Sequence, residues 1–198
     1  MDKYSTPVAV GLRAKTGRAI AVVLGGPSQS PSVLAKLELR LVDAKIPATY
    51  QPYHEVMELP WEEAQEAARK SVRIIEKVAQ KNLTALIERL KAEALTVKAV
   101  GIVGAKDRDL SRIGNYHIRA HAAEGILFRR VLDMAAETQG LRWRAFAERE
   151  FDQILKAELG AQAEQLKSSL RQLGRSLPPP WRADEKLAAA AAWMMLHG

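Results

Sequence analysis

The chain has 198 residues, 47% of them hydrophobic, which excludes an intrinsically disordered chain and suffices for the core of one globular domain. It contains no cysteine, so disulfides, thiolate catalysis and cysteine-ligated zinc are excluded. The net charge of +7 allows weak attraction to nucleic acid, although basic and acidic residues mostly alternate along the chain. The N-terminus does not resemble a signal peptide, and the longest apolar run, residues 187–196, is too short to span a bilayer. We therefore expect a cytoplasmic protein without a membrane partner.

Three strands are predicted at the start of the chain. Residues 8–14 and 18–24 are rich in valine, isoleucine, alanine and leucine, and residues 15–17 supply a turn that ends in glycine. In residues 33–42, leucines alternate with polar residues, which is typical of a half-buried strand. Three consecutive strands joined by short loops predict an antiparallel meander.

Helices and strands alternate through the rest of the chain. Residues 43–60 are an irregular connection, and the long helix predicted over 61–94 carries apolar residues at helical spacing, which favours packing on the sheet over pairing with a second chain. The nearly continuous apolar run VKAVGIVGA, residues 97–105, indicates a central strand covered on both faces. After a polar loop over 106–116, we predict a helix over 117–138 and a strand over 141–147. Residues 151–173 are predicted to be helical, with Gly160 as the point where the helix could be interrupted, and a buried helix is predicted over 183–196. The order predicts one α/β domain, residues 1–198, with a mixed sheet and helices on both faces.

This order of elements resembles the ribonuclease H-like superfamily, and its C-terminal half resembles in particular the RuvC-type Holliday-junction resolvases. The resemblance covers roughly residues 7–42 and 97–198. It is carried by the stretches VKAVGIVGA, HIRAHAAEGILFRRVLDMAAE, LRWRAFAE, QAEQLKSSLRQLGRSLPPP and RADEKLAAAAAWMMLHG. It implies a five-stranded sheet made of an antiparallel meander plus parallel strands, and an ancestral activity of metal-dependent nucleic-acid cleavage.

The family cleaves phosphodiesters with two magnesium ions, which carboxylates hold on the first strand, at the end of the fourth strand and near the start of the last helix. Here residues 11–13 read Gly-Leu-Arg, and the Arg13 guanidinium would repel a divalent cation although it could hold a phosphate. The fourth strand ends in Val-Gly-Ala at 103–105, without an acid. Only Asp184 and Glu185 remain, and Asp184 is also well placed to cap the last helix or complement its dipole. We therefore expect that the nuclease activity has been lost and that the chain needs no cofactor.

A second group of residues lies at the start of the helix predicted over 117–138. His117, His121 and Glu124 stand at i, i+4 and i+7, which places them on one helical face and could bind a divalent ion with open positions. We favour the simpler interpretation, in which the histidines are hydrogen-bonded and Glu124 pairs with an arginine, and we predict no metal ligands.

Three functions stay open on the sequence. The favoured one is a nucleic-acid-binding or structural module, with a homodimer also open, and its candidate nucleic-acid contacts are Arg13, Lys15, Arg18, Lys106 and Arg108. The first alternative is an active phosphodiesterase with a relocated site of Asp184, Glu124 and His121, using magnesium or manganese. The second is an actin-like or sugar-kinase-like nucleotide-binding protein, which is disfavoured because the first hairpin lacks a glycine-rich DxG-type phosphate turn.

Overall fold

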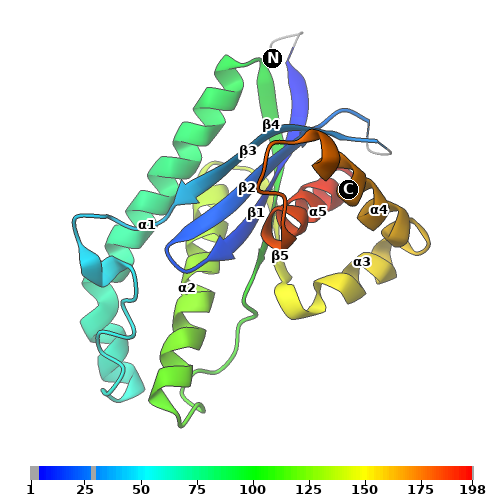
Figure 1. Cartoon of the computed structure of the whole chain (residues 1–198). Helices are drawn as coiled ribbons and strands as arrows, with labels where there is room; N and C mark the ends of the chain where they lie inside the picture. The colour runs from blue at the N-terminus through cyan, green and yellow to red at the C-terminus, as the bar shows by residue number, and fades with distance from the viewer. Residues whose placement is uncertain (1–4, 28–29, 198) are drawn as a thin grey trace.

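A five-stranded sheet forms the centre of the computed structural model, which describes residues 5–27 and 30–197 (Figure 1). The strand order is β3-β2-β1-β4-β5. Strands β1, β2 and β3 form an antiparallel meander, whereas β4 runs parallel to both β1 and β5. The strands are β1 (Thr6–Lys15), β2 (Arg18–Gly25), β3 (Ser32–Arg40), β4 (Leu95–Gly104) and β5 (Arg142–Ala147).

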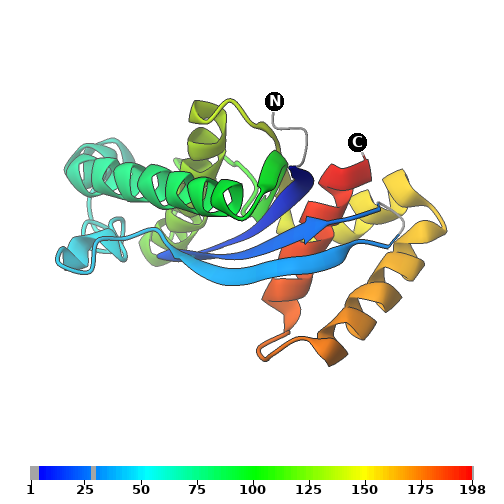
Figure 2. The ribbon, with the colours of Figure 1, turned by 90° about the horizontal axis from the view of Figure 1, so that it is seen from above.

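Helices cover both faces of this sheet (Figure 2). One face carries α1 (Trp61–Ala92) and α2 (Tyr116–Thr138), and the other carries α3 (Phe151–Leu159), α4 (Gln162–Ser176) and α5 (Ala183–His197). Two short 3-10 turns, Pro47–Thr49 and Glu148–Glu150, lie in the connections. The predicted fold class, a mixed five-stranded α/β sheet with helices on both faces, is confirmed. Within the described residues, no helix is long and apolar enough to cross a membrane.

The alternation of side chains along β1 assigns each residue to one of two hydrophobic cores. Val8, Val10 and Leu12 belong to the core shared with α1 and α2, while Ala9 belongs to the core shared with α5. Arg13 has the same parity as Ala9, and its side chain accordingly lies on the α5 side of the sheet, beside the start of that helix. Ordinary strand geometry therefore places Arg13 on the α5 face of the sheet.

Helix α5 lies almost directly on the backbone of β1 and β4, and glycine makes this possible. A Cβ atom added to Gly11 would lie 1.7 Å from the carbonyl oxygen of Ala188, and one added to Gly101 would lie 2.5 Å from that of Ala191. The helix contributes small residues at the contact, since Ala188–Ala192 are all buried. The alanine-rich sequence of the last helix thus allows close packing on the sheet, and the predicted burial of this helix is confirmed.

Some boundaries differ from those predicted. The long helix ends at Ala92 and not at 94, because Ala94 takes a positive φ of 58° as the chain turns into β4. The stretch over 151–173 is two helices, divided at Gly160, whose φ is 55°. Helix α2 begins one residue early, at Tyr116, because the Asn115 side chain accepts a hydrogen bond from the Ile118 amide at 2.9 Å and caps the helix.

Candidate functional site

The carboxyl ends of β1, β4 and β5 meet at one edge of the sheet because these three strands are parallel. From this edge β4 leads to α2 on one face, and β5 leads to α3 on the other. Such a divergence opens a crevice where open α/β sheets commonly bind ligands. Here a pocket of about 520 Å³ lies between residues 104–108 and 147–150, and His121 of α2 also lines it. We take this edge as the candidate functional site.

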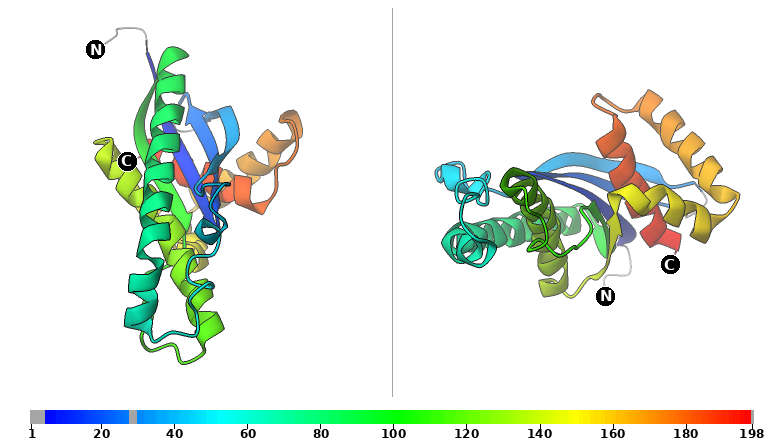
Figure 3. Two further views of the ribbon diagram at one scale, coloured as in Figure 1. Left: turned by 90° about the vertical axis from the view of Figure 1, so that its left-hand side faces the viewer. Right: turned by 90° about the horizontal axis from the view of Figure 1, so that it is seen from below.

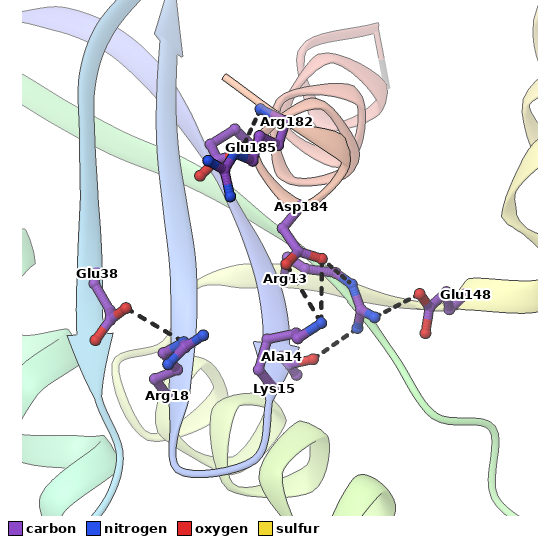
Figure 4. Close-up of polar contacts among 9 residues, drawn as sticks. All are labelled: Arg13, Ala14, Lys15, Arg18, Glu38, Glu148, Arg182, Asp184 and Glu185. Atoms are coloured by element: carbon purple, nitrogen blue, oxygen red, sulfur yellow. Dashed lines mark hydrogen bonds and ion pairs between the residues drawn. The ribbon is translucent and has the colours of Figure 1, made fainter. Parts of the chain in front are cut away.

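Four charged side chains on the α5 side of this edge form what we call the arginine cluster: Arg13, Lys15, Glu148 and Asp184 (Figure 4). Arg13 Nη2 lies 2.5 Å from Glu148 Oε1, and Arg13 Nε lies 3.5 Å from Asp184 Oδ1. Lys15 Nζ lies 3.3 Å from Asp184 Oδ2. Two cationic side chains from β1 therefore neutralise one carboxylate from the turn after β5 and one from the start of α5.

The guanidinium is the most deeply buried member of the arginine cluster. The Arg13 side chain is only 7% exposed, against 45% for Glu148 and 34% for Asp184. Arg13 Nη1 also donates a hydrogen bond to the Ala14 carbonyl oxygen at 2.6 Å. A cation held this tightly between two carboxylates occupies the place that a divalent metal would need, and its charge repels one. These residues do not fit the pair of magnesium ions that the resemblance implies.

The other acids near this edge face elsewhere. Asp107, beyond β4, pairs with Arg129 at 2.5 Å and with Arg130 at 3.0 Å on α2. Asp109 pairs with Arg112 at 3.1 Å. The loop after β4 thus supplies no carboxylate to the arginine cluster.

The start of α5 divides two tasks between adjacent acids. Glu185 Oε2 accepts a hydrogen bond from the Arg182 amide at 2.7 Å, which satisfies one of the amides at the helix start. Asp184 turns instead toward Arg13 and Lys15 (Figure 4). The capping role predicted for Asp184 is therefore filled by Glu185, and Asp184 forms ion pairs with Arg13 and Lys15.

The predicted nucleic-acid contacts differ in their availability. Arg13 and Lys15 belong to the arginine cluster, and Arg18 pairs with Glu38 at 3.3 Å on the β2–β3 ladder. Lys106 pairs with Glu150 at 2.7 Å across the pocket. Within residues 5–27 and 30–197, no ion pair involves Arg108 or Arg149, and both are exposed at the pocket. Arg149 was missed on the sequence, where nothing distinguishes it from other basic residues.

Three imidazole rings gather on the α2 side of the same edge. The histidine cluster consists of His54, His117 and His121, and one ring nitrogen from each lies within 4.8 Å of those of the other two. His117 and His121 are exposed on the first turns of α2, whereas His54 comes from the connection between β3 and α1, which runs past this end of α2 (Figure 3). His54 was missed because no local pattern links it to residues so distant in sequence.

Glu124 is the buried anchor of the histidine cluster. Its side chain is 1% exposed, and its Oε1 lies 2.8 Å from His54 Nδ1 and 3.2 Å from the His54 amide nitrogen, which donates to it. The expected arginine partner of Glu124 is wrong, since the partner is His54. Arg119 holds the same connection in place by donating to the Leu59 carbonyl oxygen at 2.6 Å.

The hypothetical relocated site of Asp184, Glu124 and His121 is divided between the two clusters. Asp184 pairs with basic residues of β1, whereas Glu124 and His121 lie with the other histidines on the α2 side. Within the described part of the chain, no hydrogen bond or ion pair joins Asp184 to either of the others.

Another buried acid lies further along α2. Arg129 donates to Asp133 Oδ2 and to Asp107 Oδ1, each at 2.5 Å. Burial raises the pKa of the Asp133 carboxyl to about 6, against the opposing attraction of the Arg129 guanidinium and with a smaller repulsion from Asp107.

The topology and the edge define an α/β protein with a mixed sheet whose carboxyl edge carries a buried arginine paired with two acids. No protein-family model and no curated protein matches the chain. Among solved structures, the chain is similar to RuvC from Thermus thermophilus, with 15% sequence identity, a TM-score of 0.48, and coverage of 94% of this chain and 91% of that one. It is also similar to T. thermophilus RuvC in complex with a Holliday junction substrate, at 14% identity and a TM-score of 0.48 over 94% and 90% of the two chains.

Proposed function

We propose that the chain is a RuvC-like, ribonuclease H-like domain that has lost metal-dependent nuclease activity and acts as a nucleic-acid-binding or structural module. The observation that carries the proposal is the Arg13 guanidinium, buried between Glu148 and Asp184 at the carboxyl edge of the sheet. Two-metal cleavage needs several carboxylate oxygens free to bind cations, and here the carboxylates are already neutralised by Arg13 and Lys15.

The exposed basic residues beside the pocket support nucleic acid as the partner. Arg108 and Arg149 lie on the two loops that bound the pocket, and the whole chain carries a net charge of +7. A guanidinium without an internal partner is available for bidentate contact with a phosphate. Nucleic acid would therefore lie across the crevice edge, over the arginine cluster and not within it.

A cleavage assay tests the loss of activity. Tag-free protein is incubated with branched and duplex DNA in magnesium or manganese, and we expect no cleavage above that of a buffer control. Cleavage that persists in the Asp184→Ala variant would place the activity outside the arginine cluster. Cleavage abolished by Asp184→Ala would show that the arginine cluster is itself catalytic, contrary to the proposal.

DNA binding is measured in a salt series. Each phosphate contact contributes about 0.9 to the slope of log K against log[salt], so the double variant Arg108→Gln/Arg149→Gln should lower that slope by up to about 2. The matched control is Arg73→Gln, an exposed arginine on α1. A slope that does not change in the double variant would favour a protein partner. Stabilisation by ATP in a thermal-shift assay would instead favour the nucleotide-binding alternative.

A further inference from the structure

We infer that the histidine cluster is a binding site for a borderline divalent transition-metal ion such as Zn²⁺. Three of the four histidines of the chain, His54, His117 and His121, come together there although one of them derives from a different element. Imidazole nitrogen suits zinc and its neighbours in the first transition row, and not magnesium or calcium, which prefer oxygen.

The arrangement around His54 is that of a metal ligand with its supporting carboxylate. Glu124 engages His54 Nδ1 at 2.8 Å, which fixes the orientation of the ring and directs Nε2 away from the carboxylate. Among the described residues, His54 Nε2 is buried without a hydrogen-bond partner. Metal-binding histidines commonly donate one ring N–H to a carboxylate and ligate through the other nitrogen.

The charge of Glu124 also favours a cation. A carboxylate that is 1% exposed is costly unless it is paired, and its Oε2 is buried without a hydrogen-bond partner among the described residues. A dication bound to His54 would compensate this charge through the imidazole ring. Arg119 does not do so, because its guanidinium donates to the carbonyl oxygens of Met57 and Leu59.

The geometry requires only a small closure. Zinc–nitrogen bonds of about 2.0–2.1 Å place the ligating nitrogens of a tetrahedral site about 3.3–3.4 Å apart. The ring nitrogens lie within 4.8 Å of one another, and His117 and His121 have exposed side chains that can rotate inward. Three protein ligands leave a fourth position for water or a partner group, on a cluster whose His121 also lines the pocket.

Zinc titration of metal-free protein tests the inference independently of any nuclease assay. Tag-free protein is dialysed against a chelator, and binding is followed by calorimetry and by the visible absorption of Co²⁺ used as a zinc substitute. We expect one ion per chain, a tetrahedral Co²⁺ spectrum, and an increase in Tm of about 5–10 °C at zinc concentrations 100-fold above Kd.

Variants distinguish a specific zinc site from nonspecific zinc binding at the surface. Because their side chains are exposed, His117→Ala and His121→Ala should remain folded, and each should weaken zinc binding by about 100-fold or more. Glu124→Gln should weaken it by about 10- to 100-fold. His197→Ala, which removes the fourth histidine at the end of α5, should bind as the wild type does. The inference would be overturned if the wild type bound no zinc, or if His117→Ala and His121→Ala bound zinc as tightly as the wild type does. Neither result depends on whether the chain binds DNA.

Discussion

The two clusters at the carboxyl edge of the sheet differ in how their buried charges are neutralised. In the arginine cluster, two carboxylates meet a buried guanidinium and an ammonium group, so the local charge is balanced by the protein itself. In the histidine cluster, the buried Glu124 accepts hydrogen bonds from the His54 ring and backbone amide, and among the described residues His54 Nε2 and Glu124 Oε2 have no hydrogen-bond partner. The arginine cluster therefore repels a further cation, whereas the histidine cluster has donor atoms that suit one.

The two clusters also differ in the donor atoms that they offer. On the α5 side, where the resemblance implies a carboxylate, the first strand carries Arg13. The donor atoms that fit a metal lie on the α2 side, and nitrogen donors would make the preferred ion different from magnesium.

The largest effect is expected where α5 touches β1, because this contact brings Asp184 to Arg13. In Gly11→Val, the new side chain would meet the Ala188 carbonyl oxygen, whose distance from an added Cβ atom is already only 1.7 Å. We expect a loss of more than about 4 kcal/mol in the free energy of unfolding, or no folded protein. The control is Gly114→Ala, where an added Cβ atom meets nothing within 4 Å. Chemical denaturation of both variants gives the comparison, and a mild effect at Gly11 would mean that α5 does not lie on β1 as described.

Removing the buried cation tests the electrostatic balance of the arginine cluster. In Arg13→Met, Glu148 and Asp184 lose their shared partner, but both are partly exposed, so we expect a loss of about 1–3 kcal/mol at pH 7. Arg18→Met is the matched control, because its pair with Glu38 is exposed and is expected to contribute less than about 1 kcal/mol. Equal losses in the two variants would show that Arg13 has no special role.

Asp133 tests how far an arginine offsets the burial of an acid on the α2 side. The folded-state pKa of about 6 lies above the ordinary value of 3.8, so the folded state binds the proton more tightly than the unfolded state. The resulting stabilisation is fully present below about pH 4 and is lost as pH rises through about 6. Because one pKa unit corresponds to about 1.4 kcal/mol, we expect this contribution to be at most about 3 kcal/mol.

The measurement is the free energy of unfolding between pH 4 and pH 7 for the wild type and for Asp133→Asn. The variant should lose less stability than the wild type across this interval. Parallel profiles would mean that the Arg129 guanidinium fully offsets the burial of the Asp133 carboxyl.

The smallest effect separates the two acids at the start of α5. Glu185→Ala removes the acceptor of the Arg182 amide and should cost about 1 kcal/mol, the usual value of a helix cap. Asp184→Ala removes a partly exposed ion pair and should cost less than about 1 kcal/mol. Thermal denaturation of the two variants at the same pH decides, and the reverse order would return the capping role to Asp184.

Much of the fold could be predicted from periodicity and composition. Of the seven apolar residues predicted to line the long helix, those at 68, 75, 79, 83, 86 and 90 are buried in α1, and Val72 is half-buried against the same core. The apolar run at 97–105 became the central strand β4, with partners on both sides. These features depend on local spacing, which the hydrophobic effect converts directly into a buried face.

The candidate site was only partly predictable, because it depends on contacts between residues that are distant in the sequence. Arg13 and Asp184 could be named because each stands at a fixed place in its own element. Glu148 was missed because an acid after a short strand carries no signal until α5 and β1 are packed around it.

Local sequence is enough to give the elements, the lack of an acid on the first strand and the two histidines on one face of α2. The packing of the whole chain is needed to bring His54 to these histidines, to place Glu124 beside His54, and to set Arg13 between two acids from different elements. Hydrophobic periodicity depends on neighbouring residues, whereas the role of a charge or a ligand depends on distant side chains that packing brings within a few ångströms.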